Sequence, residues 1–229
     1  MSNNYVTLMT SVIPRGLVAI TVPKLMESVD WGTWKVRWVV HLDNVSYLQE
    51  FYEKERADIF SLFPLFDDVR FSESRINLGV NAVMIQLFRN VWLHTNALLV
   101  EDDKLCQKPW EYGRILQLRK PYHNFGLRGH KPGGLATSWW REDLIEVVVN
   151  NYEKYKSDKE SIERSLKKFL ATKGFNRYKQ RLFDSHTFLD IGTQRLRDFG
   201  VVECKSRGLP IYVTEVPPNA VVRDPTPAP

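Results

Sequence analysis

The sequence has few cysteines and no long apolar run. Only two cysteines, Cys106 and Cys204, occur among 229 residues, and neither belongs to a CxxC pair. A disulfide framework or a structural zinc site therefore has no support, and we expect free thiols in a reducing cytoplasm. The longest uncharged apolar run, around residues 90–100, is shorter than the roughly 18–20 residues that a membrane-spanning helix needs. We therefore expect no membrane span.

Several sequence signals are also absent. Residues 1–13 lack the basic start, apolar stretch and cleavage site of a secretory signal, which favours a cytoplasmic location. No segment recurs at a solenoid period, and no GxSxG, P-loop or GxGxxG motif is found. With 43% hydrophobic and 26% charged residues, the chain has the composition of an ordinary globular protein.

Positive charge is concentrated in one segment. The whole chain has a net charge of +5, whereas residues 154–181 hold ten basic and three acidic residues, a local charge of +7. A polyanion such as DNA would meet this segment. A solvated basic helix face explains the same pattern equally well. The side chains that we expect to contact phosphates are Lys167, Lys168, Lys173, Arg177, Lys179 and Arg181.

Strand-like and helix-like segments alternate along the first half of the chain, as in α/β proteins with a parallel sheet. We predict a single α/β domain over residues 1–216, with halves at 1–105 and 106–216, a basic helical C-terminal portion and a proline-rich tail at 217–229. Predicted strands are 5–13, 34–42, 68–72, 96–100 and 135–140. Predicted helices are 22–29, 80–91, 143–155 and 162–170.

Acidic residues follow two of these strands. Asp43 follows the second strand, and Glu101, Asp102 and Asp103 follow the fourth. Ligands of open α/β sheets bind outside the carboxyl ends of the strands. Repulsion within the triplet would be offset by Mg²⁺ or Mn²⁺, which commonly bridge carboxylates and substrate phosphates. Alternatively, the triplet is a solvated turn in which Asp103 caps the next helix.

Four short motifs stand in a characteristic order. They are TSVIPR at 10–15, LDN at 42–44, NLGVNA at 77–82 and LLVEDD at 98–103. In this order and spacing the chain resembles the GT-A glycosyltransferases, in particular compact family 2-like enzymes. The resemblance covers residues 5–105 well and 135–200 loosely. It implies a Rossmann-like GT-A domain with a mostly parallel sheet that transfers sugar from a nucleotide-sugar, with a UDP-sugar as the expected donor.

The resemblance also implies a donor pocket. Pro14 and Arg15 would line the nucleotide pocket, and Asp43 would contact the uracil or ribose. The residues that would lie beside the donor are Asn77, Gly79 and Asp102.

A metal site at the diphosphate is implied as well. Glu101, Asp102 and Asp103 stand where the family has its DxD-like motif, with Asp103 the expected ligand of Mn²⁺ or Mg²⁺. Glu101 is a second predicted ligand, although Glu in place of Asp leaves its role open. Many members of this fold supply a late histidine to the metal or pyrophosphate, which suggests His186.

A general base is expected after the fifth strand in inverting members of the family. The segment WWRED at 139–143 matches that position, so Asp143 is the first choice and Glu142 the second. Acidic residues in the first turn of a helix also stabilise the helix dipole, which is an equally good explanation.

The expected acceptor follows from a second resemblance. The chain resembles, in its compactness and charge, short phage-encoded glycosyltransferases, including the TET-associated group that modifies 5-hydroxymethylcytosine in DNA. We therefore expect a DNA acceptor, in a host cytoplasm if the protein is phage-encoded. Alternatives are a saccharide, lipid or protein acceptor, or a noncatalytic DNA-binding module. A nucleotidyltransferase is disfavoured because the PRG turn at 14–16 is too short for its glycine-rich loop.

Overall fold

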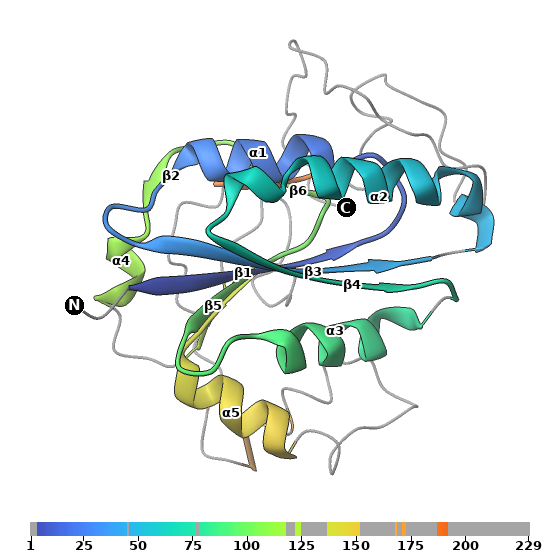
Figure 1. The fold of residues 1–229 in the computed structure, drawn as a ribbon. Coiled ribbons are helices and arrows are strands. Elements are labelled where there is room, and N and C mark those ends of the chain that lie inside the picture. The colour runs from blue at the N-terminus through green and yellow to red at the C-terminus, as the bar shows by residue number, and fades with distance from the viewer. Residues whose placement is uncertain are drawn as a thin grey trace, which may run out of the picture.

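A six-stranded sheet with helices on both faces forms the centre of the protein (Figure 1). The computed structural model describes residues 4–44, 46–76, 78–117, 122–124, 137–151, 168, 171–172 and 187–191. In spatial order the strands are β4 (Asp68–Ser74), β3 (Lys35–Asp43), β1 (Tyr5–Val12), β5 (Asn96–Val100), β9 (Thr137–Trp140) and β8 (Tyr122–Asn124). The predicted α/β class with a mostly parallel central sheet is confirmed.

Strand direction divides the sheet into two parts. Strands β4, β3, β1 and β5 are parallel, whereas β9 runs antiparallel to β5, and β8 runs antiparallel to β9. From the central strand β1 the chain passes to β3 and β4 on one side and then returns to β5 on the other. The strand order therefore reverses at β1, and such a reversal is the usual ligand position in open α/β sheets.

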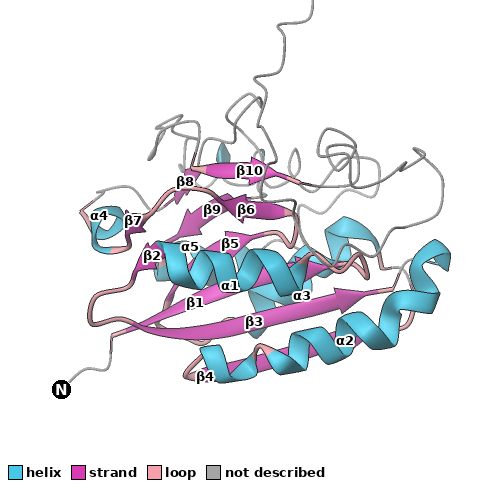
Figure 2. Ribbon diagram, turned by 90° about the horizontal axis from the view of Figure 1, so that it is seen from above, coloured by secondary structure: helices cyan, strands magenta, loops and turns pink. Residues whose placement is uncertain are grey.

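The helices bury opposite faces of the sheet (Figures 1 and 2). Helices α1 (Val18–Ser28) and α2 (Tyr52–Ser61) cover one face, and α3 (Gly79–Asn90) and α5 (Glu142–Asn151) cover the other. Because successive strand residues point to opposite faces, Leu8 and Trp38 belong to the core cluster that includes residues of α1 and α2, while Met9 and Val39 belong to the cluster that includes residues of α3. Both faces of the parallel strands are thus buried, as expected when helices cover both sides.

Short elements extend this framework. The chain also forms the 3₁₀ turns 46–51 and 63–65, β2 (Val29–Asp30), β6 (Lys104–Cys106), β7 (Trp110–Glu111), α4 (Gly113–Leu116) and β10 (Phe188–Asp190). Strand β10 pairs antiparallel with β6, so that Asp190 stands opposite Lys104. The backbone N–H of Ile191 donates a 2.8 Å hydrogen bond to the carbonyl of Asp103. A late segment of the chain is therefore held beside the acidic triplet.

The predicted strands of the first half match the structure closely, whereas the helices differ in two places: α2 was not predicted, and the start of α1 was misplaced. Helix α1 begins at Val18 rather than at residue 22, and Pro23 lies inside it. The predicted tail at 217–229, and with it the boundary at 216, lies outside the described residues. Of the predicted helix 162–170 only Lys168 is described, and it is helical. In the part of the chain that the structure describes, no helix combines the length and apolarity needed to cross a bilayer.

Trp38 provides a test of this core. Its ring is fully buried, stacks on Phe66 at a centroid distance of 4.7 Å, and donates a 3.0 Å hydrogen bond from Nε1 to Thr10 Oγ1. We expect Trp38→Ala to lower the free energy of unfolding in urea by about 3–5 kcal/mol. Trp38→Phe should lower it by about 1–3 kcal/mol, because the hydroxyl of Thr10 loses its donor. The matched control is Leu93→Ala, since Leu93 is 76% exposed. An unchanged stability of Trp38→Ala would contradict the described packing.

Candidate functional site

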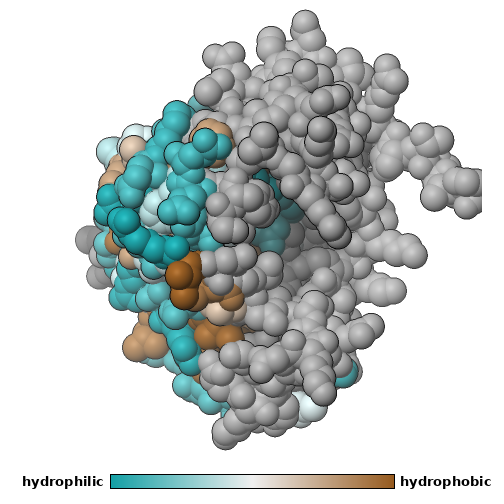
Figure 3. Space-filling model, turned by 90° about the vertical axis from the view of Figure 1, so that its right-hand side faces the viewer, coloured by the Kyte–Doolittle hydropathy of each residue, from teal (hydrophilic) through white to brown (hydrophobic). Residues whose placement is uncertain are grey.

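The predicted donor and metal residues that the structure describes lie at the carboxyl ends of the parallel strands. Residues 13–17 follow β1, Asn44 follows β3, and Glu101, Asp102 and Asp103 follow β5. Seen from this side, most of the described surface is hydrophilic (Figure 3). Strands β3 and β5 flank β1 at about 4.8 Å each, so their ends lie about 10 Å apart.

A buried ion pair joins the loops that follow β1 and β5. Arg15 Nη2 lies 2.7 Å from Asp102 Oδ1, and the two side chains are 11% and 4% exposed. Asp102 also accepts a 3.4 Å hydrogen bond from the backbone N–H of Ile13, and its carbonyl accepts one from the hydroxyl of Thr21. Burial alone would lower the pKa of Arg15, but the combined charges of Asp102, Asp103 and Glu101 and the hydrogen bond to Asp102 outweigh it and raise the pKa. Asp102 thus holds Arg15 in place.

Asp103 is held between two cations. Its Oδ2 lies 3.4 Å from Arg15 Nη2, and its Oδ1 forms an ion pair with Lys104 Nζ. Lys104 Nζ also lies 3.4 Å from Glu101 Oε2. Burial alone would raise the pKa of Asp103, but Arg15 and Lys104 outweigh it and hold the pKa below its ordinary value. At Glu101 burial dominates and raises the pKa to about 7.

The same carboxylates are suited to a divalent cation. Asp103 and Glu101 offer hard oxygen ligands, and their side chains are 14% and 28% exposed, whereas Asp102 is nearly buried and already engaged. Among the described residues no three His, Cys, Asp or Glu side chains are grouped as a metal site. His186 lies outside the described residues. The carboxylates of Asp103 and Glu101 are therefore of the type that binds Mn²⁺ or Mg²⁺. For an ion to bind there, the side chain of Arg15 or Lys104 must move away from Asp103.

Asp43 links the end of β3 to the start of α3. The carboxylate is buried, and its Oδ1 accepts a 2.9 Å hydrogen bond from the backbone N–H of Leu78, directly before Gly79. Asp43 thus lies beside the start of the helix that carries Gly79, and this hydrogen bond gives Asp43 a structural role. The neighbouring Asn77 lies outside the described residues.

Asn44, beside Asp43, has an unsatisfied buried atom. Its Nδ2 donates a 3.1 Å hydrogen bond to the carbonyl of Arg75, whereas its buried Oδ1 has no partner among the described residues. Arg15 Nε is in the same situation on the other side of β1. Because buried polar atoms are rarely left unsatisfied, a donor and an acceptor of this kind at one sheet edge suit a polar ligand.

Glu55 is a part of this edge that the sequence analysis missed. It lies on α2 with no exposed surface, and its Oε2 accepts a hydrogen bond from the backbone N–H of Gly16, in the loop that carries Pro14 and Arg15. Its Oε1 has no partner among the described residues. Burial raises the pKa of Glu55 to about 8, and the charge of Asp102 adds to the effect. Glu55 fixes the loop at Gly16, which has a φ of 76°.

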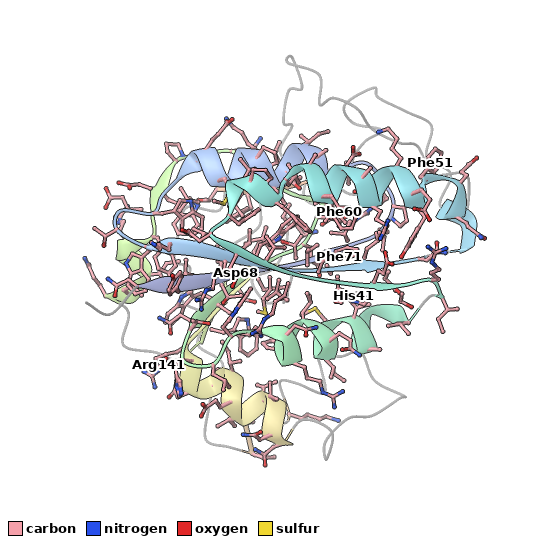
Figure 4. All side chains as sticks on the ribbon, in the orientation of Figure 1. His41, Phe51, Phe60, Asp68, Phe71 and Arg141 are labelled. Atoms are coloured by element: carbon pink, nitrogen blue, oxygen red, sulfur yellow. The ribbon has the colours of Figure 1, made fainter. Side chains whose placement is uncertain are left out.

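Glu142 and Asp143 are not at this edge, which corrects the predicted position of the general base. Strand β9 runs antiparallel to β5 and pairs Trp140 with Ala97, so the following helix starts beside the beginning of β5. Accordingly, the backbone N–H of Glu142 donates a 3.1 Å hydrogen bond to Asn96 Oδ1. Asn96 lies roughly 13 Å along β5 from Val100. Figure 4 shows Arg141 near the end where β4 begins at Asp68, whereas His41 lies toward the other end.

Asp143 instead pairs with its neighbour Arg141. Two hydrogen bonds of 2.7 and 2.6 Å join the guanidinium to the carboxylate, and the side chains are 41% and 50% exposed. The hydrogen bonds from Arg141 hold the pKa of Asp143 below its ordinary value, which suits an ion pair rather than a proton acceptor. Both acidic residues lie in the first turn of α5, where they stabilise the helix dipole.

The predicted DNA-contacting residues lie mostly outside the described part of the chain. Lys168 is described, helical and exposed. Lys167, Lys173, Arg177, Lys179 and Arg181 are outside the described residues.

Comparisons with known proteins identify the fold. No protein-family model matches the chain, and no curated protein matches it in sequence. Among solved structures, residues 1–349 of TarS from S. aureus match with a TM-score of 0.57 and 12% identity, over 86% of this chain and 63% of that chain. The mannosyltransferase PcManGT from Pyrobaculum calidifontis, in complex with GDP-Man and Mn²⁺, matches with a TM-score of 0.56 and 10% identity, over 81% and 56%. Both neighbours are GT-A-type glycosyltransferases, so this chain shares the GT-A fold and spans about three fifths of their length.

The buried carboxyl of Glu55 predicts a pH-dependent stability. Its pKa in the folded protein, about 8, exceeds the value of 4.5 expected in the unfolded chain. The folded state therefore binds more protons between these values, and its stability falls as pH rises through about 8. Glu55→Gln keeps an acceptor for Gly16 without the charge. We expect its melting temperature to exceed that of the wild type by little at pH 5 and by roughly 7–14 °C at pH 8, because the raised pKa of Glu55 corresponds to a loss of about 3–4 kcal/mol of stability over this pH range.

Glu53→Gln is the matched control for this experiment. Glu53 lies on the same helix, but its side chain is 66% exposed and 3.4 Å from Arg75. We expect a difference from the wild type that stays constant between pH 5 and 8. A constant difference for Glu55→Gln as well would show that Glu55 is charged throughout.

Proposed function

We propose that this protein is a glycosyltransferase that uses a nucleotide-sugar, with a UDP-sugar as the first expected donor and a divalent cation at the diphosphate. The observation that carries the proposal is the cluster of Arg15, Asp102 and Asp103 at the sheet edge where the strand order reverses. Its support is twofold, because the fold is that of the GT-A glycosyltransferases and this edge is where ligands of such sheets bind.

The donor would lie across the end of β1. Its nucleoside would meet Asp43 and the Oδ1 of Asn44, which has no partner among the described residues, and its diphosphate would meet Arg15 in the loop after β1. Pro14 would line the pocket, and Asn77 and Gly79 would lie beside the donor. Asp102 would keep the guanidinium of Arg15 oriented, and its buried Nε, which has no partner among the described residues, would donate to a phosphate oxygen.

The chain also offers ligands for a cation at the diphosphate. Asp103 and Glu101 would hold Mn²⁺ or Mg²⁺, with His186 as a further proposed ligand. When bound, the ion would supply Lewis-acid stabilisation of the negative charge that develops on the departing diphosphate. The neighbour PcManGT is in complex with GDP-Man and Mn²⁺, so GDP-sugars belong in any donor screen.

For the acceptor we propose 5-hydroxymethylcytosine in DNA. The support is the charge of +7 over residues 154–181 and the exposed, helical Lys168 within that segment. Lys167, Lys168, Lys173, Arg177, Lys179 and Arg181 would contact the phosphates, which predicts binding that weakens steeply with salt. A saccharide, lipid or protein acceptor is the alternative within the same reaction class.

The acceptor is tested by product mass. The full chain is incubated with Mn²⁺, a panel of UDP- and GDP-sugars, and DNA that contains cytosine or 5-hydroxymethylcytosine. The DNA is then digested to nucleosides, whose masses are measured by mass spectrometry. We expect a hexose or N-acetylhexosamine mass on the hydroxymethylated base alone. Release of the nucleoside diphosphate without a modified nucleoside would overturn the proposal of a DNA acceptor and leave the proposal of a glycosyltransferase standing. DNA binding without any turnover of a nucleotide-sugar would instead favour a noncatalytic module.

Asp103→Asn tests the donor site. Loss of the charged ligand should reduce the rate at which the nucleoside diphosphate is released at least about 100-fold, equivalent to about 3 kcal/mol of transition-state stabilisation. Asp143→Asn is the control, because Asp143 lies at the opposite edge of the sheet, and we expect at least half of the wild-type rate. Full activity of Asp103→Asn would contradict the donor site, and loss of activity in Asp143→Asn would restore Asp143 as the general base.

A further inference from the structure

Lys104 is a buried lysine whose ammonium group lies among the carboxylates of the acidic triplet. Its side chain is 5% exposed, and its Nζ pairs with Asp103 Oδ1 and with Glu101 Oε2. The other oxygen of Asp103 faces Arg15 at 3.4 Å. Each oxygen of the proposed metal ligand is thus already paired with a cation of the chain.

We propose that Lys104 occupies the cation position of this site in the metal-free protein, and that a divalent cation binds by displacing the Lys104 ammonium from Asp103. The inference rests on the proposed function and identifies the group that sets metal affinity there. When all three carboxylates are ionised, Glu101, Asp102 and Asp103 carry three negative charges against two positive charges on Arg15 and Lys104. The cluster therefore attracts a metal ion more weakly than three bare carboxylates would.

Lys104 is the cation that can leave. Arg15 is fixed by its 2.7 Å contact with Asp102, which is 4% exposed, and its planar guanidinium bonds both aspartates. An ammonium is a point charge on a flexible four-carbon chain, so it can move without disturbing the backbone. The backbone of Lys104 is pinned by the pairing of β6 with β10. Only the side chain of Lys104 needs to turn.

The test is direct Mn²⁺ binding without donor or acceptor. Free Mn²⁺ is titrated by electron paramagnetic resonance with the full-length wild type, Lys104→Met and Lys104→Arg. We expect the Kd for Mn²⁺ to fall at least tenfold in Lys104→Met, which removes the competing charge at similar length, and to change less than threefold in Lys104→Arg. Lys24→Met, which removes a lysine that is 50% exposed on α1, should bind like the wild type.

The outcomes separate the inference from the proposed function. A Kd for Mn²⁺ that is unchanged or higher in Lys104→Met would overturn the inference. A lower Kd in both Lys104→Met and Lys104→Arg would also overturn it, because a change in packing rather than the loss of charge would then be responsible. Neither result bears on sugar transfer, which is measured separately. Conversely, tighter binding in Lys104→Met alone would support the inference even if no donor were turned over.

A measurement on the wild type covers the case in which Lys104→Met does not fold. Acylation of lysines by acetic anhydride, read by mass spectrometry, reports how accessible each amine is. We expect Mn²⁺ to raise the labelling of Lys104 at least threefold and to leave Lys24 unchanged. Labelling of Lys104 that Mn²⁺ leaves unchanged or lowers would overturn the displacement.

Discussion

The contact between Arg15 and Asp102 is the constraint on which the rest of the site depends. It joins the loops after β1 and β5, at the reversal of strand order, with both side chains nearly buried. Breaking a buried pair by removing one partner leaves an uncompensated charge and is strongly destabilising. The pair therefore fixes the two loops to each other more than it adds net stability. The backbone of Asp102 reinforces the connection, because its N–H donates to the carbonyl of Ser11. Asp103 and Lys104 follow directly, so the pair also sets where the proposed metal ligand lies.

Much of the fold could be predicted because its signals are local. The β-branched and aromatic run WKVRWVVHL marks β3, and helical spacing of apolar residues marks α3. The start of α1 was missed because Val18 and Ile20 favour strands and Pro23 resembles a helix start, yet burial of the helix against β1 overrides these preferences. Helix α2 was not predicted because it buries only Tyr52, Glu55 and Ile59, too few residues for an apolar stripe.

The site was predictable where it follows from strand order and unpredictable where it follows from strand direction or long-range contact. Asp43 and Asp102 share an edge because parallel strands end on the same side. Asp143 was misplaced because the local sequence of β9 does not encode its antiparallel pairing with β5, which moves the next helix to the opposite edge. Glu55 looks like an exposed helical charge in the sequence, and only the tertiary contact with Gly16 gives it a role. The ion pairs of Asp103 with Arg15 and Lys104 were not predicted either, because they too depend on tertiary contacts.

An acidic cluster that carries its own cations has a consequence for folding. Two like charges 4 Å apart repel by about 4 kcal/mol at an effective dielectric constant of 20, so three neighbouring carboxylates would be costly without compensation. Here Arg15 and Lys104 offset that repulsion, and the raised pKa of Glu101, about 7, lets part of its population remain neutral at physiological pH. The loops after β1 and β5 can therefore fold in the absence of a metal ion. Because Arg15 and Lys104 already balance most of this charge, the position of the two loops does not depend on a bound ion.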